Sequence, residues 1–264
     1  MASLRVVTLN IWNRLGPWEE RLAVIRKGIA ELKPDLVGLQ EVIEADGKTQ
    51  AEAIAEGFGY HSAYGLANPY GGGVSLGNAV LSRWPILGTK VFRLPTGGTD
   101  ENRSMILAEI DSPHGLIPFF VTHLNWKQHE SVVREQQVLE VAACVRAEAP
   151  IDGLPPILVG DFNAQPEASE IRFLKGLQSL EGKSVYFADC FEQCGTGPGV
   201  TFDGTRNKFA EQYHEHPRRI DYVFVRGPDK LVRGKPLAAK VVFDEPVDGV
   251  FATDHFGVMA EISI

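Results

Sequence analysis

The chain has 264 residues, of which 44% are hydrophobic and 23% charged, a composition typical of a globular protein that can bury a large core. Its net charge of −8 at pH 7 disfavours long duplex DNA as a partner, because such binding depends mainly on neutralising phosphates with Lys and Arg. The sequence has no apolar stretch long enough to cross a bilayer, so we expect a soluble protein without stable membrane association.

The chain also lacks the sequence features of export and of division into several domains. Its first five residues lead directly into an apolar run and leave no room for a secretory signal, so we expect a cytoplasmic protein. Cys144, Cys190 and Cys194 have neither the even number of a disulfide framework nor a zinc spacing, which fits a reducing compartment. Without a flexible linker or a repeat, residues 1–264 are predicted to form a single domain, and we expect a monomer.

The first half of the chain begins with a strand, a helix and a strand. A strand at residues 6–9 precedes a helix in which Leu22, Ile25 and Ile29 recur at helical spacing, between Gly-Pro at 16–17 and Lys-Pro at 33–34. A second strand ends at Glu41, and a short helix is predicted near 50–56. The glycine-rich residues 68–73 predict a loop. An antiparallel meander is then predicted, with strands at residues 78–82, 86–94, 103–110 and 117–123.

The second half contains the clearest helix, at residues 130–149, where Val138, Val141 and Val145 form one apolar stripe. Strands outnumber helices, and several helices lie between strands. This pattern favours an α/β architecture of two packed β-sheets flanked by helices. The remaining predicted elements are a strand ending at Asp161, a helix at 169–177, strands near 185–191, a polar loop at 203–217, and strands at 219–225, 239–243 and 254–264.

The segment Asp161-Phe162-Asn163 is the most informative part of the sequence. It follows the apolar run 157–160 and precedes turn-forming residues, which places it at the end of a strand. Because side chains alternate along a strand, Asp161 and Asn163 point to one side while Phe162 points into the packing. A base and a hydrogen-bond donor are therefore predicted in one site.

Other predicted strands also end in carboxylates, histidines or asparagines. Polar groups at the ends of several apolar strands predict that they meet in one pocket. The residues concerned are Asn10, Glu41, His123, Asn125, Asp221, Asp254 and His255. The set is rich in oxygen and lacks thiolates, which suits Mg²⁺ or Mn²⁺ better than Zn²⁺. Such a cation serves phosphoryl chemistry by neutralising charge on phosphate oxygens.

Several of these residues also have a purely structural interpretation. Asn10 or Asn163, taken alone, fits a turn or a helix cap. Asp221 follows two arginines at 218 and 219 and fits a structural ion pair. Arg103 is either a phosphate clamp, because its planar fork matches phosphate oxygens, or a solvated strand residue.

Further residues are candidates for contact with a substrate. Asn125 lies just beyond the end of the strand that carries His123, and Arg206 lies in the polar loop before the strand of Asp221. We predict that both bind substrate, together with Arg103. Trp126 either stacks on the substrate or packs against the protein.

The chain resembles the endonuclease/exonuclease/phosphatase superfamily, the DNase I-like metal-dependent phosphodiesterases. The resemblance spans nearly the whole chain and implies a four-layered α/β sandwich. The serine that usually precedes the last Asp-His pair is Thr253 here, which preserves the hydroxyl. The motifs occur in family order: Thr8-Leu9-Asn10-Ile11-Trp12, Leu39-Gln40-Glu41-Val42, Gly77-Asn78-Ala79-Val80-Leu81-Ser82, Thr122-His123-Leu124, Gly160-Asp161-Phe162-Asn163, Arg219-Ile220-Asp221-Tyr222 and Thr253-Asp254-His255.

The resemblance implies a metal site and a base. Glu41 would be the main ligand of Mg²⁺ or Mn²⁺, with Asn10 beside it, and Asp254 would complete the metal environment. Asp161 would orient or deprotonate the attacking water, and Asn163 would hold that water or the phosphate.

The resemblance also implies two histidines that contact the phosphate. His255 would contact the scissile phosphate and would be oriented by Asp221. His123 would donate to a non-bridging oxygen as the phosphorus becomes pentacovalent, which stabilises charge. Glu101 or Asp100 would orient His123.

Two functions follow from these residues. The first is a divalent-metal-dependent phosphoester hydrolase, in which water activated by Asp161 attacks phosphorus. The alternative is a catalytically inactive phosphate- or nucleotide-binding module of the same fold, which would typically have lost Glu41, Asp161 or His255. The expected partner is a small phosphorylated substrate or a short oligonucleotide.

Overall fold

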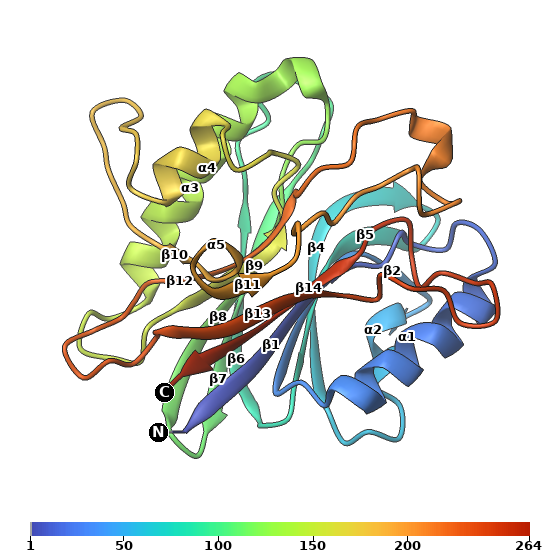
Figure 1. Cartoon of the computed structure of the whole chain (residues 1–264), viewed down its shortest axis with the longest axis horizontal. Helices are drawn as coiled ribbons and strands as arrows, with labels where there is room; N and C mark the ends of the chain where they lie inside the picture. The colour runs from blue at the N-terminus through green and yellow to red at the C-terminus, as the bar shows by residue number, and fades with distance from the viewer. Residues whose placement is uncertain (1) are drawn as a thin grey trace.

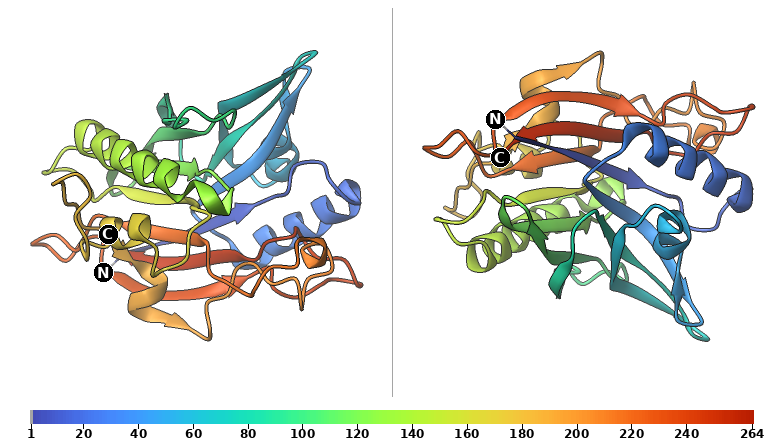
Figure 2. Two further views of the ribbon diagram at one scale, coloured as in Figure 1. Left: turned by 90° about the horizontal axis from the view of Figure 1, so that it is seen from above. Right: turned by 90° about the horizontal axis from the view of Figure 1, so that it is seen from below.

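The computed structural model describes residues 2–264 (Figure 1). Over these residues two β-sheets pack face to face, and helices cover the outer face of each sheet. Figure 2 shows these layers from two sides, with the two ends of the chain next to each other. The predicted four-layered α/β sandwich is confirmed.

The larger sheet has the strand order β11-β13-β14-β1-β2-β5-β4, and β3 pairs with β2 outside this path. β1 and β2 are parallel, whereas β14 and β5 are antiparallel to the strands beside them. The strands are β1 (Ser3–Asn10), β2 (Leu36–Ala45), β3 (Lys48–Thr49), β4 (His61–Gly71), β5 (Val74–Ser82), β11 (Gly195–Thr196), β13 (Pro236–Val242) and β14 (Gly257–Ser263).

The smaller sheet has the strand order β10-β12-β9-β8-β7-β6. β8 and β9 are parallel, and β12 is antiparallel to β9. The strands are β6 (Ile86–Arg93), β7 (Ser104–Ser112), β8 (Gly115–His123), β9 (Ile157–Asp161), β10 (Ala188–Asp189) and β12 (Asp221–Val225).

Helices α1 (Trp18–Leu32) and α2 (Gln50–Ala55) cover the larger sheet, and α3 (Ser131–Glu148) and α4 (Ser169–Leu174) cover the smaller one (Figure 1). The helix α5 (Cys190–Cys194) follows β10, and the 3-10 turns η1 (Gln128–Glu130) and η2 (Glu211–Tyr213) lie in loops. The predicted limits of α1 are confirmed, since Pro17 precedes it and Lys33 ends it with a left-handed φ of 48°. Among residues 2–264, no helix has the length and apolar character needed to span a membrane.

The alternation of side chains along the strands produces three apolar layers. On β1, Val6 lies between the two sheets and Val7 lies on the side of α1. On β8, Val121 lies between the sheets and Phe120 lies on the side of α3 and α4. Both sheets are therefore apolar on both faces, and the strand ends are where polar side chains collect.

The prediction of a loop at residues 68–73 is wrong. β4 continues to Gly71, and only Gly72 and Gly73, with left-handed φ angles of 60° and 77°, make the turn into β5. Glycine content identified the turn but not its short length. The strands form a long hairpin that projects from the larger sheet.

Two other strand predictions are wrong. β5 does not continue a meander with β6, β7 and β8, because it pairs with β2 and β4 in the larger sheet. The three residues 83–85 carry the chain from one sheet to the other, which spacing along the sequence does not reveal. Residues 185–191 contain only the short β10, because the Asp189 side chain accepts from the Glu192 backbone N–H and begins α5.

Candidate active site

The predicted catalytic and metal-binding residues lie where one edge of each sheet meets the other. β1 and β2 are parallel, as are β8 and β9, so the carboxyl ends of each pair lie at the same edge. Asn10 at the end of β1 donates from Nδ2 to Asp161 Oδ2 at the end of β9, at 3.1 Å, which joins the two edges. A pocket of about 430 Å³ opens there, and its lining includes Glu41, Arg103, His123, Asp161, Asn163, Asp254 and His255.

Asp161 is the last residue of β9, which lies between β8 and β12 in the smaller sheet. Its partners in register are His123 on β8 and Asp221 on β12. Residues directly opposite each other on neighbouring strands project from the same face, so these three side chains meet. Gly160 allows this close approach, because a Cβ there would lie 2.0 Å from the Thr122 carbonyl oxygen.

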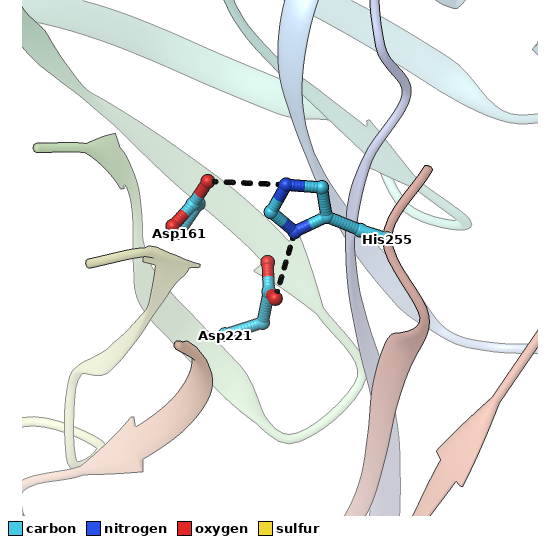
Figure 3. Close-up of side chains that lie close together, drawn as sticks. All are labelled: Asp161, Asp221 and His255. Atoms are coloured by element: carbon cyan, nitrogen blue, oxygen red, sulfur yellow. Dashed lines mark hydrogen bonds and ion pairs between the residues drawn. The ribbon is translucent and has the colours of Figure 1, made fainter. Parts of the chain in front are cut away.

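Asp161, Asp221 and His255 form a buried cluster (Figure 3). His255 Nδ1 donates to Asp221 Oδ2 at 3.0 Å, and its Nε2 lies 3.8 Å from Asp161 Oδ2. Although burial opposes the charge of His255, the carboxylates of Asp221 and Asp161 raise its pKa to about 10. Burial, with the charge of Asp221, raises the pKa of Asp161 to about 6. At neutral pH the cluster therefore pairs a charged imidazole with an ionised Asp161.

The ion-pair alternative for Asp221 is excluded. Arg219 pairs with Asp189 at 2.8 Å, and Arg218 pairs with a different carboxylate. Asp221 Oδ1 is buried and has no hydrogen-bond partner within residues 2–264. The side chain of Asp221 therefore binds His255 and neither of the two arginines.

His123 lies beside Asp161, with 3.4 Å between Nε2 and Oδ2. Asn163 Nδ2 lies 3.1 Å from the same ring nitrogen, and Arg103 Nη1 lies 3.0 and 3.2 Å from the two ring nitrogens. Burial, followed by the positive charges of Arg103 and His255, lowers the pKa of His123 well below its usual range. His123 is therefore neutral and keeps one N–H to donate.

The prediction that Glu101 or Asp100 orients His123 is wrong. Glu101 Oε2 lies 3.3 Å from Arg103 Nη2, and its Oε1 accepts from Trp126 Nε1 at 2.9 Å. Asp100 is exposed and pairs with a lysine. Glu101 is connected to His123 through Arg103. Arg103 is therefore the residue that contacts this imidazole and places a positive charge beside it.

Glu41 lies in a bulge of β2. The pairing of β2 with β5 shifts between Leu39 and Val42, and Glu41 itself has a left-handed φ of 57°. A bulge turns a side chain away from the regular alternation of its strand. The Glu41 carboxylate lines the pocket and accepts from Asn10 Nδ2 at 3.2 Å and from Asn13 Nδ2 at 2.9 Å.

Asn10 links the two carboxylates of the site through its amide N–H groups, and its amide oxygen is bonded to the backbone instead of facing a metal. Its Nδ2 donates to both Glu41 and Asp161, while its Oδ1 accepts from the Trp12 backbone N–H at 3.0 Å. In this arrangement Asn10 positions the metal-ligand candidate Glu41 against the base candidate Asp161.

The carboxylates of Glu41 and Asp254 fit a hard divalent cation. Burial raises the pKa of Asp254 to about 7, the charge of His255 opposes this shift, and the charge of Glu41 adds to it. Two carboxylates in a pocket without thiolates are a donor set whose charge Mg²⁺ or Mn²⁺ would neutralise.

The cluster of Asp161, Asp221 and His255 also has the dimensions of a metal site, since its ligand atoms lie within 4.8 Å of one another. Glu41 and Asp254 have the donor chemistry that suits a cation better. His255 Nδ1 already donates to Asp221, and a protonated imidazole has no lone pair for a metal.

Arg21 is a residue of the site that sequence reasoning missed. It is fully buried, and its guanidinium donates to backbone carbonyl oxygens in residues 11–15 and to that of Ala252, at distances of 2.8 to 3.3 Å. These segments carry Asn13 and lead into Asp254. The available signal was its position four residues before Ile25 on the apolar stripe of α1, where an arginine is unexpected.

The structure does not bring Asn125 or Arg206 to the pocket. Asn125 is fully buried, and its Nδ2 donates to Glu130 Oε2 at 2.7 Å. Arg206 lies over the Phe256 ring and donates to Glu245 Oε1 at 3.0 Å. The prediction that these two side chains bind substrate is therefore contradicted by their contacts.

Long side chains surround the mouth of the pocket. Tyr70 from the β4–β5 hairpin is 57% exposed, Trp126 is 52% exposed and Tyr213 is 42% exposed. We refer to these three residues and Arg218 as the rim. We refer to the ionisable groups below the rim as the floor. It consists of the partly buried Glu41 in the β2 bulge and of five buried residues at or beside strand ends, His123, Asp161, Asp221, Asp254 and His255.

Solved structures with the same fold cover the whole chain. An endonuclease/exonuclease/phosphatase from Beutenbergia cavernae DSM 12333 is 25% identical, with a TM-score of 0.73 over 100% of this chain and 72% of that chain. D. rerio TDP2, solved with a single-strand DNA product, is 20% identical, with a TM-score of 0.80 over 100% of both chains. A family protein from Leptotrichia buccalis C-1013-b is 19% identical, with a TM-score of 0.74 over 99% and 100%.

No curated protein sequence matches the chain. The sequence model of the Endonuclease/Exonuclease/phosphatase family matches residues 7–255, a span that contains every residue of the floor. The chain therefore belongs to the endonuclease/exonuclease/phosphatase family.

Proposed function

We propose that the protein is a phosphoester hydrolase that depends on Mg²⁺ or Mn²⁺ and uses water to attack phosphorus. The observation that carries this proposal is the buried contact of Asp161 and Asp221 with His255. Asp161 and His255 line one pocket with Glu41 and Asp254. Membership of a family of phosphoester hydrolases supports it.

The floor supplies a base and two donors for the displacement. Asp161 accepts the proton of the attacking water, and burial makes its carboxylate more basic than in solution. Asp221 holds the His255 imidazole, whose charge stabilises the negative oxygens of the transition state. Neutral His123 donates its N–H to a non-bridging oxygen, and Asn163 orients the water or the phosphate beside it.

A cation held by Glu41 and Asp254 would neutralise charge on the phosphate oxygens. Asn10 and Asn13 fix the Glu41 carboxylate in the pocket, and Thr253 donates to Asp254 Oδ1 at 3.1 Å. Both carboxylates are therefore held in place by the protein.

We propose a small phosphorylated molecule or a short oligonucleotide as the substrate class. The pocket volume of about 430 Å³ suits a group the size of a nucleotide. The net charge of −8 disfavours long duplex DNA. The single-strand DNA product bound to D. rerio TDP2 supports a strand end as one member of this class.

The test is a panel of phosphodiesters and phosphomonoesters assayed with Mg²⁺ or Mn²⁺. We expect hydrolysis of at least one aryl phosphodiester and its loss in Asp161→Asn. Binding of nucleotides without turnover, under every metal condition, would contradict the proposal. That result would instead identify an inactive binding module of the same fold.

A further inference from the structure

A second chamber of about 820 Å³ opens beside the pocket. The two spaces share Asn163, Tyr213, Glu215 and Arg218 in their linings. They are therefore adjoining parts of one cleft. The remaining walls of the second chamber include His214 and His216, as well as one further carboxylate, Glu167.

Arg218 is the arginine of this chamber that has a buried N–H without a partner among residues 2–264. Arg134 also lies on the wall, but its Nε donates to Glu170 Oε1 at 2.6 Å and its Nη1 to a backbone carbonyl at 2.8 Å. Arg218 Nε is buried and has no hydrogen-bond partner within residues 2–264. A buried donor without a partner is costly, which points to an acceptor that the protein itself does not provide.

The position of Arg218 relates the second chamber to the reacting site. Arg218 Cζ lies 5.5 Å from the centroid of the Phe202 ring, and the His255 ring lies 4.9 Å from the same centroid. The guanidinium and the His255 imidazole therefore both lie next to the Phe202 ring. An anion on Arg218 would lie close to a phosphate at His255 without competing for its place.

In the structure, Glu215 forms an ion pair with the guanidinium of Arg218. Its Oε2 accepts from Arg218 Nη2, and its Oε1 accepts from Gln128 Nε2 at 3.0 Å. This pair lies at the boundary between the two spaces, because both Glu215 and Arg218 line both of them. A ligand that binds Arg218 must displace or share this carboxylate.

We propose that the second chamber binds a second phosphate of the substrate through Arg218, and that Glu215 occupies Arg218 until this phosphate replaces it. A phosphate carries more charge than a carboxylate and matches the planar fork of arginine. The inference rests on the proposed function and narrows its substrate class to molecules that carry at least two phosphates.

The test compares the binding of thymidine 3′,5′-bisphosphate with that of the 5′- and 3′-monophosphates, by titration calorimetry in buffer with Mg²⁺. The wild-type protein should prefer the bisphosphate. Arg218→Gln should reduce this preference by roughly tenfold, as expected for a charged hydrogen bond. Glu215→Gln should increase it, because the competing charge is removed while the shape is kept.

The matched controls are Arg233→Gln and Asp229→Asn. These residues form another ion pair, with 2.6 Å between Nε and Oδ2, and neither lines the two chambers. Their preference for the bisphosphate should equal that of the wild type. An unchanged preference in Arg218→Gln, or an equal change in the controls, would overturn the inference.

A hydrolysis assay separates this inference from the proposed function. The substrate is the p-nitrophenyl ester of thymidine 5′-phosphate, supplied with Mg²⁺ or Mn²⁺. A wild-type protein that hydrolyses no ester contradicts the proposed function, while the binding ratios still decide the role of Arg218. If Arg218→Gln does not fold, Glu215→Gln decides alone, since an unchanged preference in that variant overturns the inference.

Discussion

The floor and the rim of the pocket are built in different ways. Most floor side chains come from strand ends and are buried, and Asp161 and Asp221, which both contact His255, are at most 1% exposed. Rim side chains are long, come from a hairpin and loops, and Tyr70 and Trp126 are about half exposed. A buried, bonded group is fixed before a substrate arrives, which favours stabilisation of a transition state. We therefore expect changes in the floor to lower kcat and changes in the rim to alter KM.

The largest effect expected in the floor is that of metal removal. EDTA should reduce hydrolysis of a phosphodiester to background, and Mg²⁺ or Mn²⁺ should restore it, because the donor set of Glu41 and Asp254 suits hard cations. Glu41→Gln should raise the Mg²⁺ concentration for half-maximal rate by about tenfold or more. Full activity in the presence of EDTA would show that hydrolysis does not depend on a metal at this site.

Asp161→Asn tests whether the floor acts in the transition state. The substitution keeps the shape of the side chain and removes the base, so kcat should fall by roughly 10² or more while KM changes little. The measurement is steady-state kinetics on an aryl phosphodiester, with thermal unfolding as a check on the fold. Asp100→Asn is the matched control, because this exposed carboxylate pairs only with Lys127 outside the pocket and should retain wild-type kcat.

Arg21→Met tests how much of the floor depends on the residue behind it. The change leaves several buried carbonyl oxygens without their donor, so we expect a loss of about 3 kcal/mol in the free energy of unfolding. The Mg²⁺ requirement should also rise, since the freed segments carry Asn13 and Asp254.

Chemical denaturation and metal titration of Arg21→Met and Arg21→Lys provide the measurements. Lysine keeps the charge but has fewer donors, so Arg21→Lys should lie between the wild type and Arg21→Met in both quantities. A loss of stability with an unchanged metal requirement would make Arg21 a purely structural residue.

The sequence predicted the fold and the floor for a shared physical reason. Apolar runs with period-2 and helical spacing define the layers, and polar residues that interrupt them are conspicuous, as at Asp161. Glu41 was predicted to end its strand, but β2 continues to Ala45, and Glu41 lies in a bulge. Arg21 was missed because its partners are backbone carbonyls, which carry no side-chain signature.

The rim was harder to predict because its residues depend on the paths of loops. Tyr70 was assigned to a loop, but it lies on a strand of a hairpin that reaches over the pocket. Asn125 and Arg206 have suitable chemistry and neighbouring positions in the sequence, yet each is bound by a nearby carboxylate elsewhere. Which partner a polar side chain finds is a tertiary property that spacing does not reveal.

Trp126→Ala tests the rim with a smaller expected effect. Loss of an exposed aromatic surface should raise KM for a nucleotide ester by about five- to tenfold and leave kcat within about twofold, by analogy with base stacking on aromatic residues. Trp126→Phe should recover most of the affinity, although it loses the hydrogen bond to Glu101. If kcat falls as far as in Asp161→Asn, the division between floor and rim is wrong.

Salt dependence should give the smallest effect. The arginines near the pocket mouth are already paired, Arg103 with Glu101 and Arg218 with Glu215, so they add little net positive charge for a long phosphate chain. The slope of log(kcat/KM) against log[NaCl] should therefore correspond to no more than about one neutralised phosphate, both for a dinucleotide and for a long single strand. A bis-aryl phosphodiester serves as the reference for salt effects on the reaction itself. A slope equivalent to several phosphates on the long strand alone would show that the rim extends into a nucleic-acid groove, and would reverse our ranking of substrates while leaving the chemistry of the floor unchanged.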